Sequence, residues 1–241
     1  MLTLIMPMAG AGTRFEEAGY TTSKPMIPVG DVPMFVHAER CIGIDFEKRI
    51  FIVRKEQNIK EDILKWYPDA HVHELDHLTE GTACTILSVE DLITDKDSIL
   101  VANCDQHTEW DSEHALSLMN SVFVAGFISV FHCPEKDPKW SFAETDSEGR
   151  VLRVAEKDPI SEWGTTGYYY WKDGRQFCRN AKQMIAANDR VNNEFYTCPV
   201  YNYTIKECNE WGVSRVVTIE VDRMQGIGTP EDLNEFHSTQ R

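Results

Sequence analysis

The first 120 residues alternate between short apolar runs and longer segments with helical spacing, and this rhythm is the strongest constraint on the fold. Short apolar runs are typical of buried strands, and apolar residues three and four positions apart indicate amphipathic helices. Because strands separated by helices form β-α-β units, the pattern predicts a mostly parallel sheet. We expect strands at residues 2–6, 49–54, 70–75 and 98–102, and helices at residues 33–42, 57–67 and 81–93.

Beyond residue 120 the alternation changes to longer strands joined by turns. Asp146-Ser147-Glu148-Gly149 is a hairpin signal, and Thr229-Pro230 followed by acidic residues is typical of a helix start. We therefore expect one α/β domain, residues 1–241, with a Rossmann-like, mostly parallel sheet flanked by helices (1–120) and a mixed-sheet half (121–241). The strands expected in the second half are 123–131, 140–145, 150–155, 167–171 and 213–221, and the helix is 173–187.

The net charge of −15 limits the partners that this chain can bind. An acidic surface repels polyphosphate backbones and anionic lipids, so we expect neither nucleic acid nor a membrane as a partner. A small anionic substrate is compatible, because a few Lys and Arg side chains can form a local positive pocket. The seven cysteines include no Cys-x-x-Cys pair, which predicts reduced thiols and a cytoplasmic protein. Residues 1–8 are expected to form a strand rather than a signal peptide.

A glycine-rich loop directly follows the first expected strand, in the segment Met8-Ala9-Gly10-Ala11-Gly12-Thr13-Arg14. Small residues allow backbone N–H groups to approach phosphates closely. Arg14 adds a cationic fork, and Lys24 follows ten positions later, before Pro25. The loop is not a P-loop, since no Gly-Lys-Ser/Thr closes it, and Phe15 replaces the third glycine of a dinucleotide fingerprint.

The segments Gly10-Ala11-Gly12-Thr13-Arg14 and Lys24-Pro25 resemble the signature of the sugar-phosphate nucleotidyltransferases, also called nucleoside-diphosphate-sugar pyrophosphorylases. Further motifs follow in the order of that family along nearly the whole chain, and their shared order is more specific than any one of them. They are Glu80-Gly81-Thr82-Ala83, Asn103-Cys104-Asp105, Glu156-Lys157, Thr166-Gly167-Tyr168 and Gly228-Thr229-Pro230-Glu231-Asp232-Leu233. The resemblance implies a GT-A-like nucleotidyltransferase fold with a nucleotide-binding first half and an acceptor-binding second half.

The resemblance also implies a reaction in which an acceptor phosphate attacks the α-phosphorus of a nucleoside triphosphate and expels pyrophosphate. Arg14 would neutralise the leaving pyrophosphate, and Lys24 would stabilise charge near the α-phosphate. Lys157 would hold the incoming phosphate, and Asp105 would bind Mg²⁺. Residues 8–13 with Gly81 and Thr82 would bind the nucleotide. The residues expected at the acceptor site are Trp140, Glu156, Thr166, Gly167 and Glu194. His107 is expected to have a loop role rather than to bind the ion.

Two positions depart from the family pattern. A second metal-binding Asp usually lies two residues before the final Gly-Thr, where this chain has Gly226. Either Asp222 substitutes for it, or the ion relies on Asp105, water and phosphates. Asp76 stands where some relatives have a Gln; an ionised Asp accepts hydrogen bonds only, so it favours CTP or GTP if it faces the base. It is alternatively an exposed loop residue.

The leading hypothesis is therefore a magnesium-dependent nucleotidyltransferase that joins a nucleoside triphosphate to a sugar 1-phosphate for surface-polysaccharide assembly. Its main rival is a cytidylyltransferase that acts on a non-sugar phosphate such as choline or glycerol phosphate. A glycosyltransferase is a further alternative, but those usually carry Asp-x-Asp, and Asn103-Cys104-Asp105 lacks the first carboxylate. A non-catalytic nucleotide-binding protein is another alternative function. The chain is also compatible with a homo-oligomer.

Overall fold

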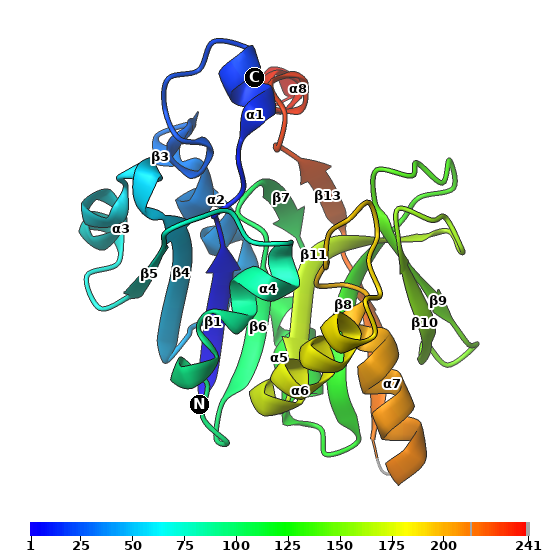
Figure 1. Ribbon diagram of the computed structural model, residues 1–241. Helices are drawn as coiled ribbons and strands as arrows, with labels where there is room; N and C mark the ends of the chain where they lie inside the picture. Colours follow the sequence, from blue (N-terminus) through cyan, green and yellow to red (C-terminus); the bar gives the residue numbers. More distant parts are fainter. Residues whose placement is uncertain (213, 240–241) are drawn as a thin grey trace.

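One sheet of nine strands runs through the part of the chain that the structure describes (Figure 1). The structure, a computed structural model, describes residues 1–212 and 214–239. The main strand order is β10-β9-β11-β6-β1-β4-β5; β8 also pairs with β11, and β12 pairs with β8. These strands are β1 (Leu2–Pro7), β4 (Lys48–Arg54), β5 (His71–Leu75), β6 (Ser98–Ala102), β8 (Val124–His132), β9 (Ser141–Thr145), β10 (Val151–Glu156), β11 (Trp163–Trp171) and β12 (Arg215–Glu220).

The first half of the sheet is parallel, and the second half is mixed. β6, β1, β4 and β5 are parallel, whereas β11 is antiparallel to both β6 and β8. The prediction of an α/β fold with a mostly parallel sheet continuing into a mixed sheet is therefore confirmed. The helices are α1 (Thr13–Glu17), α2 (Met34–Ile42), α3 (Lys60–Trp66), α4 (Thr82–Leu87), α5 (Ser112–Asn120), α6 (Gly174–Ala186), α7 (Val200–Trp211) and α8 (Pro230–Thr239), with 3-10 turns at Lys24–Met26, Lys55–Gln57 and Glu90–Leu92.

The core has two layers because successive strand residues point to opposite faces of the sheet. In β1, Leu4 and Met6 pack with α2, α3 and α5, while Ile5 packs on the other face with α4, α6 and α7. All three β1 side chains are fully buried. An apolar run without polar alternation is what a strand covered on both faces requires.

Beyond the end of the sheet, α8 lies beside α1 (Figure 1). A third apolar cluster joins them, and Phe15 and Phe236 are among its buried members. Two short ribbons complete this end: β7 (Gln106–Glu109) pairs with β13 (Arg223–Gly226), and β2 (Pro28–Val29) pairs with β3 (Val32–Pro33). The C-terminal helix is thereby held against the glycine-rich loop region.

Most expected elements appear with small shifts in their bounds, and β6 has the bounds that the sequence predicts. The helix expected at 81–93 is broken, because Val89 leaves helical geometry with φ −112° and ψ 18°. The strand expected at 167–171 begins earlier, at Trp163, and α5 was not predicted. Residue 213, the first of the strand expected at 213–221, lies outside the described residues. None of the described helices has the length and apolar character needed to cross a bilayer.

We expect Phe236→Ala to destabilise the protein by about 3–5 kcal/mol, because it removes a buried ring that joins α8 to the rest of the chain. Urea unfolding would measure the loss. Phe123→Ala is the matched control, since Phe123 is 65% exposed and its truncation should cost little. Equal unfolding free energies for the two variants would contradict the role given to the third apolar cluster.

Candidate active site

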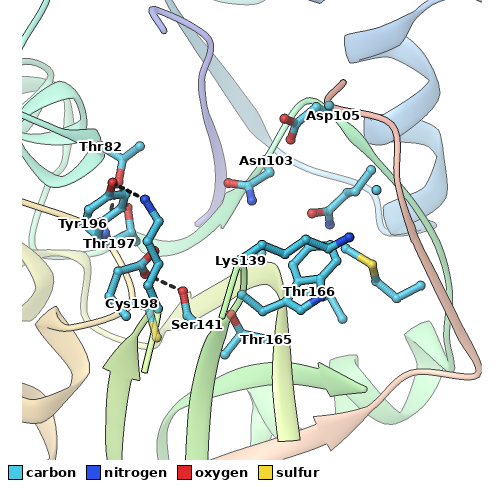
Figure 2. Close-up of a pocket in the computed structure, with 18 of the residues that line it drawn as sticks. Thr82, Asn103, Asp105, Lys139, Ser141, Thr165, Thr166, Tyr196, Thr197 and Cys198 are labelled. Carbon is cyan, nitrogen blue, oxygen red and sulfur yellow. Dashed lines mark hydrogen bonds between the residues drawn. The ribbon is translucent and has the colours of Figure 1, made fainter. Parts of the chain in front are cut away.

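A cavity of about 370 Å³ lies between the parallel and mixed parts of the sheet. Residues that follow the carboxyl ends of β1 and β6 line one side, which is where ligands bind in open α/β sheets. Side chains from β9, β10 and β11 line the other. Figure 2 shows Asn103 and Asp105 on one side of this space, and Tyr196 and Thr197 across from them. Residues far apart in the sequence thus form one polar cavity.

Lys24 and Asp105 form the tightest charged contact in this cavity, with 2.5 Å between Nζ and Oδ2. Lys24 belongs to a 3-10 turn whose second residue is Pro25, and Asp105 lies just beyond β6. Burial lowers the pKa of Lys24, but Asp105 and Cys104 together outweigh that effect, and the resulting pKa is raised above its ordinary value. Lys24 is therefore a permanent cation at the edge of the sheet.

The glycine-rich loop lines a second cavity of about 290 Å³, through Gly10, Ala11 and Gly12. Arg54 supports this loop by donating a hydrogen bond to the Gly10 carbonyl at 3.3 Å. Lys24 lines both cavities. A ligand that extends from the loop into the larger cavity would thus pass the Lys24 ammonium.

The turn that contains Gly81 and Thr82 is bound to the segment before α7. The Phe195 carbonyl accepts a hydrogen bond from the Ala83 N–H at 2.9 Å, and Thr82 Oγ1 accepts one from the Thr197 N–H at 3.0 Å. A Cβ on Gly81 would lie 2.4 Å from the Phe195 oxygen, so this approach requires glycine. Thr82 lines the larger cavity, and Gly81 does not.

Lys157 enters the larger cavity from the end of β10. Its Nζ donates a hydrogen bond to the Tyr196 hydroxyl at 2.7 Å and lies 4.6 Å from the centre of that ring. Next to it, Glu156 is buried and accepts a hydrogen bond from Ser141. Burial raises the pKa of Glu156, and Ser141 and Lys157 oppose that shift. The cavity thus carries a positioned cation beside hydrogen-bonding groups.

An irregularity in β11 shapes the floor of the cavity. The register against β8 shifts between Thr165 and Tyr169, and Gly167 between them has φ +98°. A Cβ on Gly167 would lie 2.3 Å from Asn103 Nδ2 and 2.7 Å from Gln106 Oε1. Only glycine allows β11 to come this close to the segment after β6.

The carboxylates of Asp105 and Asp232 line the larger cavity on the side of the glycine-rich loop. Asp232 lies in the first turn of α8, and its Oδ2 accepts a hydrogen bond from Thr229 Oγ1 at 2.8 Å. A Cβ on Gly226 would lie 4.0 Å from Asp232 Oδ2. Asp232 therefore brings a carboxylate close to the position where the family pattern has an Asp and this chain has Gly226. From the sequence, Asp232 is predicted only as an acidic residue at the start of a helix.

Several expected site residues line the larger cavity, namely Arg14, Lys24, Thr82, Asp105, Trp140, Glu156, Lys157, Thr166 and Gly167. Other expected residues lie outside both cavities. Met8 and Ala9 are buried, Thr13 is exposed on α1, and Glu194 is exposed in a β-bridge with Val191. The additional polar side chains in the larger cavity include Gln106, Lys139, Thr165 and Thr197, which no short motif singled out. Asn103 also lines it; this residue belongs to the motif Asn103-Cys104-Asp105 but had no predicted role.

Asp76 and Asp222 also lie outside both cavities. The Asp76 carboxylate is exposed and lies 2.5 Å from Lys55 Nζ. Asp222 is exposed between β12 and β13, and its N–H donates to the Glu109 carbonyl at 2.8 Å. The role of Asp76 in binding the nucleobase and that of Asp222 in binding the metal remain predictions.

The sequence matches the family model for nucleotidyl transferases over residues 3–198. Because this match covers most of the chain, the protein belongs to the nucleotidyltransferase family. The resemblance seen in the sequence is thereby confirmed. A comparison with curated protein sequences found no significant match.

Solved structures share the fold over nearly the whole chain. A nucleoside-diphosphate-sugar pyrophosphorylase from Vibrio cholerae is 22% identical, with a TM-score of 0.80 over 98% of this chain and 99% of that one. A candidate glucose-1-phosphate thymidylyltransferase from Bacillus anthracis is 19% identical, with a TM-score of 0.80 over 100% and 96%. The inositol-1-phosphate CTP transferase from T. maritima is 13% identical, with a TM-score of 0.75 over 98% and 93%. At these identities the likeness establishes the fold alone.

We expect Gly167→Ala to destabilise the protein more than Gly149→Ala. Both residues have positive φ, so each substitution should cost about 1–2 kcal/mol of backbone strain. Only the Gly167 variant also drives a Cβ into Asn103 and Gln106, whereas the nearest atom to a Cβ at Gly149 is 3.8 Å away. Thermal unfolding of the two variants would measure the difference. A smaller loss at Gly167 would show that β11 can move away from β6 at little cost.

Proposed function

We propose that this nucleotidyltransferase joins a nucleoside triphosphate to a small phosphorylated acceptor, a sugar 1-phosphate in the leading case, and releases pyrophosphate. The observation that carries the proposal is the position of Lys24, which lines both the loop cavity and the larger cavity. Triphosphate oxygens along the glycine-rich loop would leave the α-phosphate beside Lys24. Lys157 approaches the same cavity from β10, where it can hold a second phosphate.

The charge of the larger cavity supports an anionic ligand. The protein carries a net charge of −15, yet the cations of this cavity outnumber its acids. The cations are Arg14, Lys24, Lys139 and Lys157, and the acids are Asp105, Glu156 and Asp232. Two polyanions repel each other in water, so a site that joins them must neutralise and align them. No general base is needed, because the attacking phosphate oxygen is already ionised at neutral pH.

The acceptor side of the cavity suits a ligand with hydroxyl groups. Ser141, Thr165 and Thr166 offer hydroxyls, and Glu156 offers a carboxylate. Trp140 adds an apolar wall, and its carbonyl accepts a hydrogen bond from the Lys157 N–H at 3.1 Å. A sugar ring has alternating hydroxyls and apolar faces, and such a lining complements both. We propose that the product serves surface-polysaccharide assembly and that the enzyme works in the cytoplasm. The seven free cysteine thiols support the cytoplasmic location only.

Mg²⁺ fits the donor set of this site, because Asp105 and Asp232 supply the oxygen ligands that hard cations prefer. When bound, the ion would neutralise charge on the phosphate oxygens. We propose that Asp232, rather than Asp222, supplies the second carboxylate, since Asp232 lines the cavity and Asp222 does not.

The proposal for the nucleobase depends on Asp76. CTP or GTP is the proposal if Asp76 turns towards the base and releases Lys55, with which it is now paired. The main rival function, a cytidylyltransferase for a non-sugar phosphate, draws on the inositol-1-phosphate CTP transferase of T. maritima, which shares the fold.

Pyrophosphate release tests these proposals. We expect release only when one of the four nucleoside triphosphates, Mg²⁺ and a sugar 1-phosphate are all present. Arg14→Ala should lower kcat/KM by roughly 10²–10³-fold, because one charge-stabilising contact is lost. Arg153→Ala is the control, since Arg153 is exposed and pairs with Glu144 outside the cavity.

Turnover of choline or glycerol phosphate, but not of sugar phosphates, would favour the rival cytidylyltransferase. Nucleotide binding without pyrophosphate release, across the whole acceptor panel, would support the non-catalytic alternative and contradict the proposal. Unchanged turnover in Arg14→Ala would contradict the role of the glycine-rich loop region.

A separate comparison tests the second carboxylate. Asp232→Asn should raise the Mg²⁺ concentration for half-maximal activity by at least roughly tenfold, since a neutral amide binds the ion less well. Asp222→Asn should behave like the wild type, because its side chain is exposed outside the cavity. Titration of activity with Mg²⁺ measures both, and the reverse order of effects would assign the role to Asp222.

A further inference from the structure

Three metal-ligating side chains meet between α2 and β7, in a group that no step of the proposed reaction uses. They are His37, Cys41 and His107, called here the His-Cys cluster. His37 and Cys41 are four residues apart on α2 and so share one face of that helix. His107 belongs to β7, against which α2 packs. All three side chains are half-buried.

The distances within the His-Cys cluster match those of a tetrahedral metal site. His37 Nε2 lies 3.0 Å from His107 Nδ1, and Cys41 Sγ lies 3.7 Å from His37 Nε2 and 3.5 Å from His107 Nδ1. Tetrahedral Zn²⁺ with ordinary bond lengths separates two nitrogen ligands by about 3.3 Å, and a nitrogen and a sulfur ligand by about 3.5 Å. The three donor atoms are therefore close enough together to bind one ion.

The surroundings of His107 support the same assignment. Its other ring nitrogen, Nε2, lies 3.2 Å from Glu109 Oε1. Histidines that bind metals usually donate this second N–H to a carboxylate or carbonyl, which fixes the tautomer that leaves the first nitrogen free. The Phe236 ring packs on both imidazoles, with centroids 5.4 Å from His37 and 5.0 Å from His107.

We propose that the His-Cys cluster binds one transition-metal ion of the Zn²⁺ class. Two imidazoles and a thiolate select Zn²⁺ and similar ions over Mg²⁺, which prefers oxygen ligands. Binding converts the Cys41 thiol to a thiolate and releases its proton to solvent. The ion would join α2 to β7, and β7 begins directly after Asp105. It would thereby brace the segment that carries the Mg²⁺-binding carboxylate while remaining chemically distinct from it.

Co²⁺ is the probe that tests this site, because a bound thiolate gives a charge-transfer band and a tetrahedral ion gives visible bands. Chelator-treated protein, titrated without nucleotide, should bind one Co²⁺ per chain with both signals, and Zn²⁺ should displace it. Cys41→Ser should lose the charge-transfer band. His37→Asn and His107→Asn should weaken binding by more than roughly 100-fold, and Glu109→Gln by about 10–100-fold.

Matched variants separate this site from the rest of the protein. Cys84→Ser and His114→Asn change a half-buried cysteine on α4 and an exposed histidine on α5, and should bind Co²⁺ like the wild type. Asp105→Asn should keep the charge-transfer band, which shows that the ion is not in the Mg²⁺ site. Zn²⁺ should also raise the Tm of the wild type but not of Cys41→Ser.

A wild-type protein that binds no stoichiometric Co²⁺ or Zn²⁺ would overturn the proposal, as would equal binding by Cys41→Ser. In that case the His-Cys cluster would be a hydrogen-bonded group only. Because the titration contains no nucleotide or acceptor, its failure leaves the proposed nucleotidyl transfer unaffected. Absence of nucleotidyl transfer would likewise not affect the result of the metal titration.

Discussion

The contact between Lys24 and Asp105 is the interaction on which the arrangement of the active site depends. It joins the segment after the glycine-rich loop to the segment after β6, and the chain closes over it at Gly228. A Cβ on Gly228 would lie 2.5 Å from Asp105 Oδ2 and 3.4 Å from Lys24 Nζ. The Ile227 N–H also donates to the Asp105 carbonyl at 2.9 Å. Three distant parts of the chain therefore converge on one ion pair.

This convergence explains how a strongly acidic protein can offer a site for anions. The cations of the larger cavity come from the loop region, the β8–β9 connection and the end of β10, so no basic run appears in the sequence. Lys24 is paired with Asp105, and Lys157 donates a hydrogen bond to the Tyr196 hydroxyl. Such contacts fix the positions of long side chains before a ligand arrives, which reduces the entropy lost on binding.

β7 links the two ion-binding proposals, because it starts beside Asp105 and carries His107. The two sites differ in donor chemistry: carboxylate oxygens line the larger cavity, while imidazole and thiol groups lie between α2 and β7. Hard and soft donors separated in this way select different ions. α8 contacts both regions, since Asp232 lines the cavity and Phe236 packs on the imidazoles. The position of α8 therefore affects both sites.

The sequence by itself determined the α/β class, the bounds of β6, the loop after β1 and the start of α8 at Thr229, which caps the Asp232 N–H. These features depend on neighbours a few residues apart, through periodicity, turn chemistry and capping. Only the tertiary structure decided that Asp232 rather than Asp222 lines the cavity, that Gly167 allows β11 to approach Asn103, and that His37 and Cys41 meet His107. Such encounters depend on strand register and on how distant elements pack, because side chains remote in sequence become neighbours only when the whole chain has folded.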